Sequence, residues 1–225
     1  MGSATVVEAT TATGPAAPGP LVRQRSPFEA ISPVERPARD GRIGVRLSAG
    51  TVSSVTLIAT WPGGIGALSQ ALGAALSSAV PAKTGDVVHQ HRGLLVRTGP
   101  EEFLLVSEQN QDMVKTLRHK IPADTGSVTD LSHARCHISI EGVQCRATLS
   151  KLFALDLRDA AFPLDQVRLT GHHHVPCLLH RRERERFDLY VFTTYASDQL
   201  STLIDAALEY GVALTVSHAN GDVQA

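Results

Sequence analysis

Short apolar runs alternate with amphipathic stretches from about residue 41 onward. Residues 52–61 are β-branched and apolar, which predicts a strand, and Pro62-Gly63-Gly64 ends it. Beyond this turn, apolar residues recur at spacings of three and four, as on the buried face of a helix: Ile65, Leu68, Leu72, Ala75 and Leu76. Shorter apolar runs predict three further strands, at residues 87–88, 94–97 and 103–106.

The rest of the chain continues this alternation. Asn110 is the predicted N-cap of a helix that ends before Pro122. After Gly142 another helix is predicted, with an apolar face made of Cys145, Leu149, Leu152 and Phe153. A last helix begins at Ser197 and ends at Gly211. Strands are predicted between these helices, at residues 128–131, 136–140, 167–169, 177–180 and 187–192.

This order of elements predicts a mixed α+β fold. Each half of the chain runs strand, helix, hairpin, helix, so we expect two ferredoxin-like (split βαβ) halves in one domain, residues 39–225, with an internal duplication. Residues 1–38 lack periodicity and are rich in proline, which predicts a flexible or surface-draped leader. Within the leader, Pro27-Phe28 is an apolar anchor without a core of its own, and we expect it to lie against a neighbouring protein.

Composition narrows the classes of function. The 225 residues are 43% hydrophobic and 19% charged, which fits a globular protein of one or two domains. Lys and Arg number 21 against 22 Asp and Glu, a balance that excludes a large basic domain for nucleic acid. No apolar run reaches the roughly 18 to 20 residues of a membrane span, and residues 1–20 hold no Lys or Arg, unlike a secretion signal. Three cysteines, an odd number, favour reduced thiols and a cytoplasmic location.

A glycine-rich turn is the first candidate site. Pro62-Gly63-Gly64-Ile65-Gly66 follows a strand and opens a helix, as a dinucleotide-binding loop does, where glycines let backbone N–H groups approach a pyrophosphate. The third glycine position is Ser69, however, and Asp86 precedes its strand, whereas a ribose-binding acid follows one. We therefore favour a tight strand-to-helix turn and keep a small nucleotide-binding regulator as an alternative.

Histidines and cysteines form the richest set of candidate metal ligands. His172-His173-His174 lies close to Cys177 and His180, and a zinc site would need Cys136, His137 or Cys145 to complete it. No Cys-x-x-Cys pair occurs, and consecutive strand residues point to opposite faces, so the triplet cannot converge on one ion. We predict no metal site, a buried and inert Cys145, and a solvent-exposed histidine triplet.

The sequence pattern does not bring catalytic groups together either. Cys136 and His137 are strand neighbours facing opposite ways, so they cannot share a proton. Glu101 and Glu102 are paired acids, but a hairpin turn should leave them solvated. Residues 181–186, Arg-Arg-Glu-Arg-Glu-Arg, are predicted as a solvated hairpin tip, with a partner-docking rim as the alternative. We predict no catalytic, cofactor-binding or metal-binding residue in this chain.

Several short motifs follow one another in an order shared with a known family. Arg25-Ser26-Pro27-Phe28 is similar to its Arg-Ser-Pro-Leu, and Gly99-Pro100-Glu101-Glu102-Phe103-Leu104 to its Gly-Pro-Asp-Glu-Trp-Leu. Val128-Thr129-Asp130-Leu131-Ser132-His133-Ala134-Arg135 is similar to Val-x-Asp-Val-Ser-x-Ala-Arg, and Leu155-Asp156-Leu157 and Ala161-Phe162-Pro163 come next. Phe28, Phe103 and Val143 depart from the family's Leu, Trp and Pro. Over roughly residues 26–208 the chain resembles the gamma subunit of heterotetrameric sarcosine oxidase.

This resemblance implies a fold and a role. The fold would be aminomethyltransferase-like, two intertwined halves akin to the folate-binding domain of the glycine-cleavage T-protein. The role would be that of a non-catalytic subunit in an oxidoreductase complex that demethylates sarcosine to glycine with oxygen and tetrahydrofolate. FAD, FMN, NAD, zinc and tetrahydrofolate would be held by the partners, the alpha, beta and delta subunits, with no cofactor in this chain, no nucleic acid and no membrane.

Two alternatives stay open. One is the small subunit of an N-methylglutamate dehydrogenase-type complex, a sister family that uses a similar small subunit. The other is a stand-alone folate-binding aminomethyltransferase-like protein. Such a protein needs a carboxylate to pair with a pterin. Asp130, at the end of a predicted central strand, is the one candidate for that pairing, and we predict a structural role for it.

Overall fold

A computed structural model describes residues 26–52, 54–91, 93–107 and 112–217, which form two β-sheets and four α-helices. Sheet A has the strand order β1-β12-β2-β8-β11-β10-β9 and is antiparallel except between β12 and β2. Its strands are β1 (Val34–Arg36), β2 (Val45–Thr51), β8 (Arg135–Glu141), β9 (Gln166–His172), β10 (Val175–Glu183), β11 (Arg186–Phe192) and β12 (Val212–Val216).

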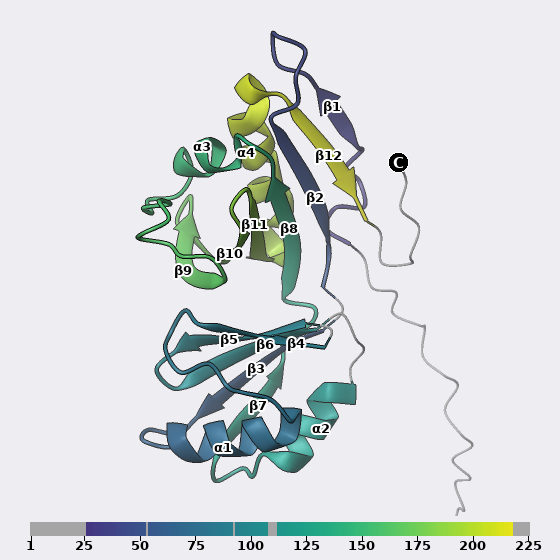
Figure 1. Cartoon of the computed structure of the whole chain (residues 1–225). Helices are drawn as coiled ribbons and strands as arrows, with labels where there is room; N and C mark the ends of the chain where they lie inside the picture. The colour runs from purple at the N-terminus through teal and green to yellow at the C-terminus, as the bar shows by residue number, and fades with distance from the viewer. Residues whose placement is uncertain (1–25, 53, 92, 108–111, 218–225) are drawn as a thin grey trace, which may run out of the picture.

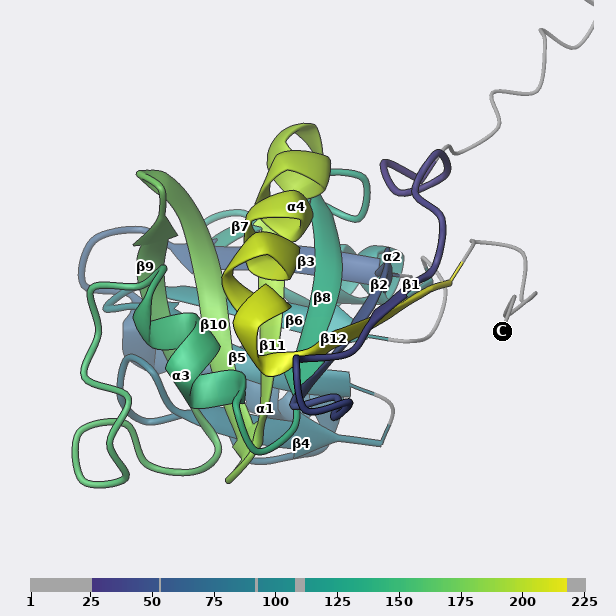
Figure 2. The same cartoon turned by 90° about the horizontal axis from the view of Figure 1, so that it is seen from above.

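Sheet B is smaller and wholly antiparallel, with the order β4-β5-β6-β3-β7. Its strands are β3 (Ser54–Thr60), β4 (Val87–Gln90), β5 (Gly93–Gly99), β6 (Glu102–Ser107) and β7 (Gly126–Asp130). The two sheets lie face to face, and the strands of sheet B run across those of sheet A (Figure 2).

The helices cover the outer faces of this sandwich (Figure 1). The helices α1 (Ile65–Leu76) and α2 (Asp112–Lys120) pack on sheet B, and α3 (Cys145–Ser150) and α4 (Ala196–Ala207) pack on sheet A. Two single-turn 3-10 helices flank α4, η1 (Thr193–Tyr195) and η2 (Leu208–Tyr210). The molecule therefore has four layers: helices, sheet, sheet, helices.

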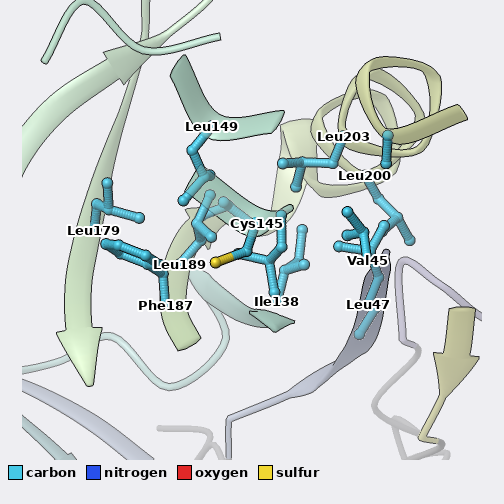
Figure 3. Close-up of a cluster of buried hydrophobic side chains, with 14 of the residues drawn as sticks. Val45, Leu47, Ile138, Cys145, Leu149, Leu179, Phe187, Leu189, Leu200 and Leu203 are labelled. Atoms are coloured by element: carbon cyan, nitrogen blue, oxygen red, sulfur yellow. The ribbon is translucent and has the colours of Figure 1, made fainter. Parts of the chain in front are cut away.

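Each layer boundary is a hydrophobic core. The largest core lies between sheet A and its helices, where Leu200 and Leu203 of α4 face Val45 and Leu47 of β2 (Figure 3). A second core, including Leu68, Leu72 and Leu117, joins sheet B to α1 and α2. A third joins the two sheets, through Val55 and Val106 of sheet B and Leu178 and Tyr190 of sheet A. Burial on both faces of each sheet explains why many of the strands are apolar runs without clean alternation.

The two halves share one order of elements. The first runs β3-α1-β4-β5-β6-α2-β7 and the second β8-α3-β9-β10-β11-α4-β12. Strand order is also shared, except that sheet A has two additional strands, β2 between β8 and β12 and β1 at the edge beside β12. Because β2 precedes the first half in the chain but pairs inside the sheet of the second, the halves are intertwined. The expected α+β fold with two split βαβ halves is confirmed.

Most predicted elements are present, with three strands missed. The structure contains the predicted helices at α1, α2, α3 and α4 and the predicted hairpin strands. The sequence reading did not find β1, β2 or β12, which are short or interrupted by polar residues such as Arg46 and Ser48. Asn110, the predicted N-cap of α2, lies outside the described residues.

The expectation that Pro27-Phe28 lies against a neighbour is wrong for Phe28. Its side chain is fully buried in the core between sheet A and α4. The Ser197 hydroxyl, at the start of α4, donates a hydrogen bond to the Pro27 carbonyl at 2.7 Å and holds the segment in place. The predicted leader thus contributes a core side chain and the edge strand β1, while its residues 1–25 lie outside the described residues.

Candidate functional site

The inner face of sheet A carries a row of polar side chains. Strand side chains alternate between faces, and on sheet A one set enters the core under α3 and α4 while the other set faces sheet B or solvent. On this second face, five residues pair side by side across five strands: Thr215, Ser48, Ser139, Asp188 and His180. We call these five residues the polar row.

Asp188 is the electrostatic centre of the polar row. It is 1% exposed, and its carboxylate lies 3.1 Å from His137 Nε2 and 3.4 Å from Arg182 Nη1. Burial alone would raise the pKa of Asp188, but the hydrogen bond and charge of His137, with the charge of Arg182, hold it below its usual range. Asp188 is therefore an ionised carboxylate that lies between His137 and Arg182.

A second acid–histidine group joins the two sheets at the other end of the row. Asp165 Oδ1 lies 3.1 Å from His180 Nε2 of β10 and 2.8 Å from His89 Nε2 of β4. His180 is almost fully buried, and burial lowers the pKa of its imidazole although Asp165 opposes the shift. Asp165 thus bridges sheet A and sheet B through two histidines.

Two hollows open on this face, and His137 lines both. One, of about 400 Å³, lies between the sheets and is bordered by His89, His137, Arg182 and Tyr190. The other, of about 410 Å³, lies over β2, β8, β11 and β12 and is bordered by Arg46, Ser139, Glu141 and Arg186. Both have the size of small-molecule sites.

The polar groups of this face do not form a nucleophile–base pair. Ser139, next to Asp188 in the row, has a buried hydroxyl without any hydrogen-bond partner, so it is not activated by His137. Of the described carboxylates on this face, Asp188 lies beside His137 and Arg182, and Glu141, which borders the second hollow, lies 4.0 Å from Arg186.

Asp130 has the structural role that was predicted for it, but not the predicted position. Strand β7 is an edge strand of sheet B and not a central one. The Asp130 carboxylate accepts hydrogen bonds from the Ser132 hydroxyl and backbone N–H, at 2.6 and 2.9 Å, and these lower its pKa. Ser132 in turn accepts a bond from the Val55 N–H, so Asp130 fastens the turn after β7 to β3.

In the glycine-rich turn, the side chain of Glu101 takes the position where a bound anion would lie. Gly63 has φ +81°, and its N–H donates to Glu101 Oε1 at 2.9 Å, in the place where an anion would bind. A Cβ on Gly64 would lie 2.3 Å from Thr60 Oγ1, so this glycine serves close packing. Glu101 and Glu102, predicted to be solvated, are half-buried because each accepts a hydrogen bond, Glu102 from Thr98.

The cysteines and histidines do not converge. Cys136, Cys145 and Cys177 are buried and unpaired on the helix side of sheet A, and burial raises the pKa of Cys145 and Cys177 to about 11. His137 and His180 lie on the opposite face, as alternation requires. Among the described residues, no group of three His, Cys, Asp or Glu side chains could hold a metal ion.

The histidine triplet is only partly exposed, against our expectation. His173 and His174 form the exposed β9–β10 turn with φ +48° and +68°. His172, the last residue of β9, is fully buried with its ring 5.2 Å from that of Phe153, and neither ring nitrogen has a hydrogen-bond partner. Burial lowers its pKa to about 4.

The arginine-rich run is also divided between two environments. Residues 182–185 are exposed at the tip of the β10–β11 hairpin, as predicted. Arg181 is 1% exposed, because its side chain points to the helix side, where it donates to the Phe162 carbonyl and to Asp159. The prediction of a wholly solvated tip is therefore wrong for Arg181.

Sequence reasoning missed the residues that organise this face. Asp188 stands within the apolar stretch Phe187-Asp188-Leu189-Tyr190-Val191, and a charge inside a central strand is the signal that could have found it. Asp165 has no such signal, since it lies in a loop.

No helix of the described part of the chain is long and apolar enough to cross a membrane.

Comparison with known proteins gives relatives in sequence. No protein-family model matches the chain. It is 31% identical over 144 residues to the sarcosine oxidase subunit gamma of Corynebacterium sp. strain U-96, covering 64% of this chain and 70% of that protein. The subunit gamma of strain P-1 is 28% identical over 149 residues, covering 66% of this chain and 71% of that one.

Solved structures show the same relationship. A chain of the heterotetrameric sarcosine oxidase from Corynebacterium sp. U-96, solved with pyrrole 2-carboxylate, matches with a TM-score of 0.68 at 28% identity, over 74% of this chain and 85% of that one. The aminomethyltransferase T of the glycine cleavage system from Bartonella henselae matches at 14% identity with a TM-score of 0.53, over 79% of this chain and 48% of that one, and so shares the fold. With sequence and fold in agreement, the chain belongs to the family of sarcosine oxidase gamma subunits.

Proposed function

We propose that this chain acts as the non-catalytic gamma subunit of a heterotetrameric oxidase that demethylates sarcosine to glycine, with oxygen and tetrahydrofolate as co-substrates. The observation that carries the proposal is the similarity to sarcosine oxidase subunit gamma over 70% of that protein's length. The match to a chain of a solved heterotetramer supports assembly with other subunits.

In this proposal the partners are the alpha, beta and delta subunits, and they hold FAD, FMN, NAD, zinc and tetrahydrofolate. Three features of the chain support a structural role. Asp188 is committed to His137 and Arg182, the cysteines are buried with raised pKa values, and the glycine-rich turn is closed by Glu101. The burial of all three cysteines without a disulfide between them also supports assembly in the cytoplasm.

Co-expression of the tagged full chain with the alpha, beta and delta subunits of the same organism tests the proposal. We expect the tag to retain all three partners, the complex to form peroxide with sarcosine, and the chain purified alone to be colourless and inactive. The matched control is the same preparation without this chain.

Two results would contradict this function. Bound flavin or metal with sarcosine turnover by the isolated chain would make it an enzyme in its own right. A complex that oxidises N-methylglutamate and leaves sarcosine unchanged would assign it to the N-methylglutamate dehydrogenase type.

A further inference from the structure

Arg135 holds an unusual position at the start of β8. Its side chain lies on the inner face of sheet A, like that of His137, and pairs across the strands with Phe192 of β11. The guanidinium carbon lies 3.7 Å from the centre of the Phe192 ring, so the two groups stack. This stacking holds the planar guanidinium in one orientation.

The guanidinium of Arg135 has no acidic partner. Its Nε and Nη1 atoms are buried without a hydrogen-bond partner, and no ion pair of the described residues includes it. Burial accordingly lowers its pKa. Arg181 of the same sheet shows the usual arrangement, since it reaches both Asp159 and the Phe162 carbonyl. Arg135 is only partly buried as a residue, but a charge whose Nε and Nη1 are withdrawn from water without an ion-pair partner is costly, so Arg135 points to a partner from outside the chain.

A hollow of about 220 Å³ opens beside this guanidinium. Its wall is formed by Pro27, Thr51, Ser132, His133 and Thr193 together with Arg135 and Cys136. No Asp or Glu lines it. The two nearby carboxylates lie outside its wall, where Asp130 accepts from Ser132 and Glu102 from Thr98. They act electrostatically on His133 and Arg135 from there, but the wall itself offers a fixed guanidinium and an exposed histidine, His133, without an acidic side chain beside them.

We propose that this hollow is a docking socket into which a partner subunit inserts the carboxylate of an Asp or Glu side chain, held by Arg135. The inference rests on the proposed function, because it requires a partner subunit. Because Nε and Nη1 are enclosed, the contact is made by Nη2, whose N–H groups donate to a carboxylate oxygen in a charge-assisted hydrogen bond.

The size and surroundings of the socket favour a protein side chain over a free anion. At about 220 Å³ it is smaller than the roughly 300 to 1,000 Å³ of small-molecule sites and suits a single side chain. The 3-10 helix η1, which contributes Thr193 to the wall, also carries Tyr195, 50% exposed. Arginine and tyrosine are the residues in which binding energy concentrates at protein interfaces.

The test compares the affinity of full-length variants for the assembled alpha, beta and delta subunits. Arg135→Met removes the charge and keeps an apolar stem against Phe192, and we expect it to weaken binding by about tenfold or more. Arg135→Lys keeps the charge without the planar guanidinium and should lose less. The matched control is Arg42→Met, an exposed arginine in the β1–β2 connection that pairs with Asp40, which should bind like the wild type.

Thermal unfolding of the same variants separates docking from stability. Because Arg135 is unpaired in the free chain, Arg135→Met should unfold at the same temperature as the wild type or higher. A lower melting temperature with unchanged affinity would make the stacking on Phe192 purely structural and overturn the proposal. Equal binding of wild type and Arg135→Met would overturn it while leaving the proposed function intact, whereas failure of the wild type to bind would remove both.

Titration with free anions checks the source of the carboxylate. We expect acetate and inorganic phosphate to bind the isolated full chain only weakly in calorimetry. Binding of either below about 1 mM that is lost in Arg135→Met would assign the socket to a free anion and overturn the assignment to a partner side chain.

Discussion

Acidification from pH 7 to pH 5 probes the buried imidazole of His172. The pKa of this side chain falls from the ordinary 6.5 to about 4 because it is buried, and because His173 repels the charged form more than Asp198 favours it. The unfolded chain therefore binds a proton at a pH where the folded chain does not. The free energy of unfolding must fall as the pH drops below about 6.5, and the loss is complete below about 4.

The size of the effect follows from the two pKa values. A shift of 2.5 units corresponds to about 3 kcal/mol in full, and between pH 7 and pH 5 the expected loss is about 2 kcal/mol. This is a large part of the stability of a typical domain. His180 adds a smaller loss of the same sign, since burial also lowers its pKa, while Asp188 begins to contribute only below about pH 4.

The assay is urea unfolding at the two pH values for wild type, His172→Leu and a control, His174→Asn. Leucine cannot titrate and fits an apolar site beside Phe153, so His172→Leu should lose about 2 kcal/mol less than the wild type between pH 7 and pH 5. His174 is exposed in a turn with positive φ, which asparagine tolerates, so this variant should follow the wild type. Equal losses in wild type and His172→Leu would refute the reasoning.

Three further predictions concern the core, the polar row and the thiols. Phe28→Ala should lower the free energy of unfolding by about 3 kcal/mol, because Phe28 is fully buried, and a change below about 1 kcal/mol would place this segment outside the core. Asp188→Asn should cost about 2 kcal/mol at pH 7, because His137 and Arg182 lose a charged partner. That cost should shrink below about pH 4, where the wild-type carboxylate begins to lose the same advantage, and a cost independent of pH would contradict the pairing. A thiol reagent at pH 8 should label none of the three cysteines in the folded chain and all three in denaturant, and rapid labelling of any of them without denaturant would show that it is not buried.

Local patterns were sufficient to predict the helices and the hairpins. The apolar spacing of α1 and the turn between β5 and β6 depend on residues that are neighbours in sequence, and the structure has both where the pattern places them. The opposite facing of Cys136 and His137 followed in the same way from strand geometry alone.

The polar row and the socket at Arg135 could not be read from local patterns. Asp188 meets Ser139 and Ser48 only because β11, β8 and β2 pair side by side, and β2 reaches that place from the far end of the chain. Strand order is decided by burial shared between distant segments, which leaves no trace in the spacing of nearby residues. The same reason explains the errors made at Phe28, which was expected against a neighbouring protein, and at His172 and Arg181, which were expected to be solvated. Only the packing of sheet A against its helices encloses these side chains. Sequence alone thus determined the local elements and the family likeness, whereas the tertiary structure decided which polar groups meet and which are enclosed, since both depend on contacts between residues far apart in the chain.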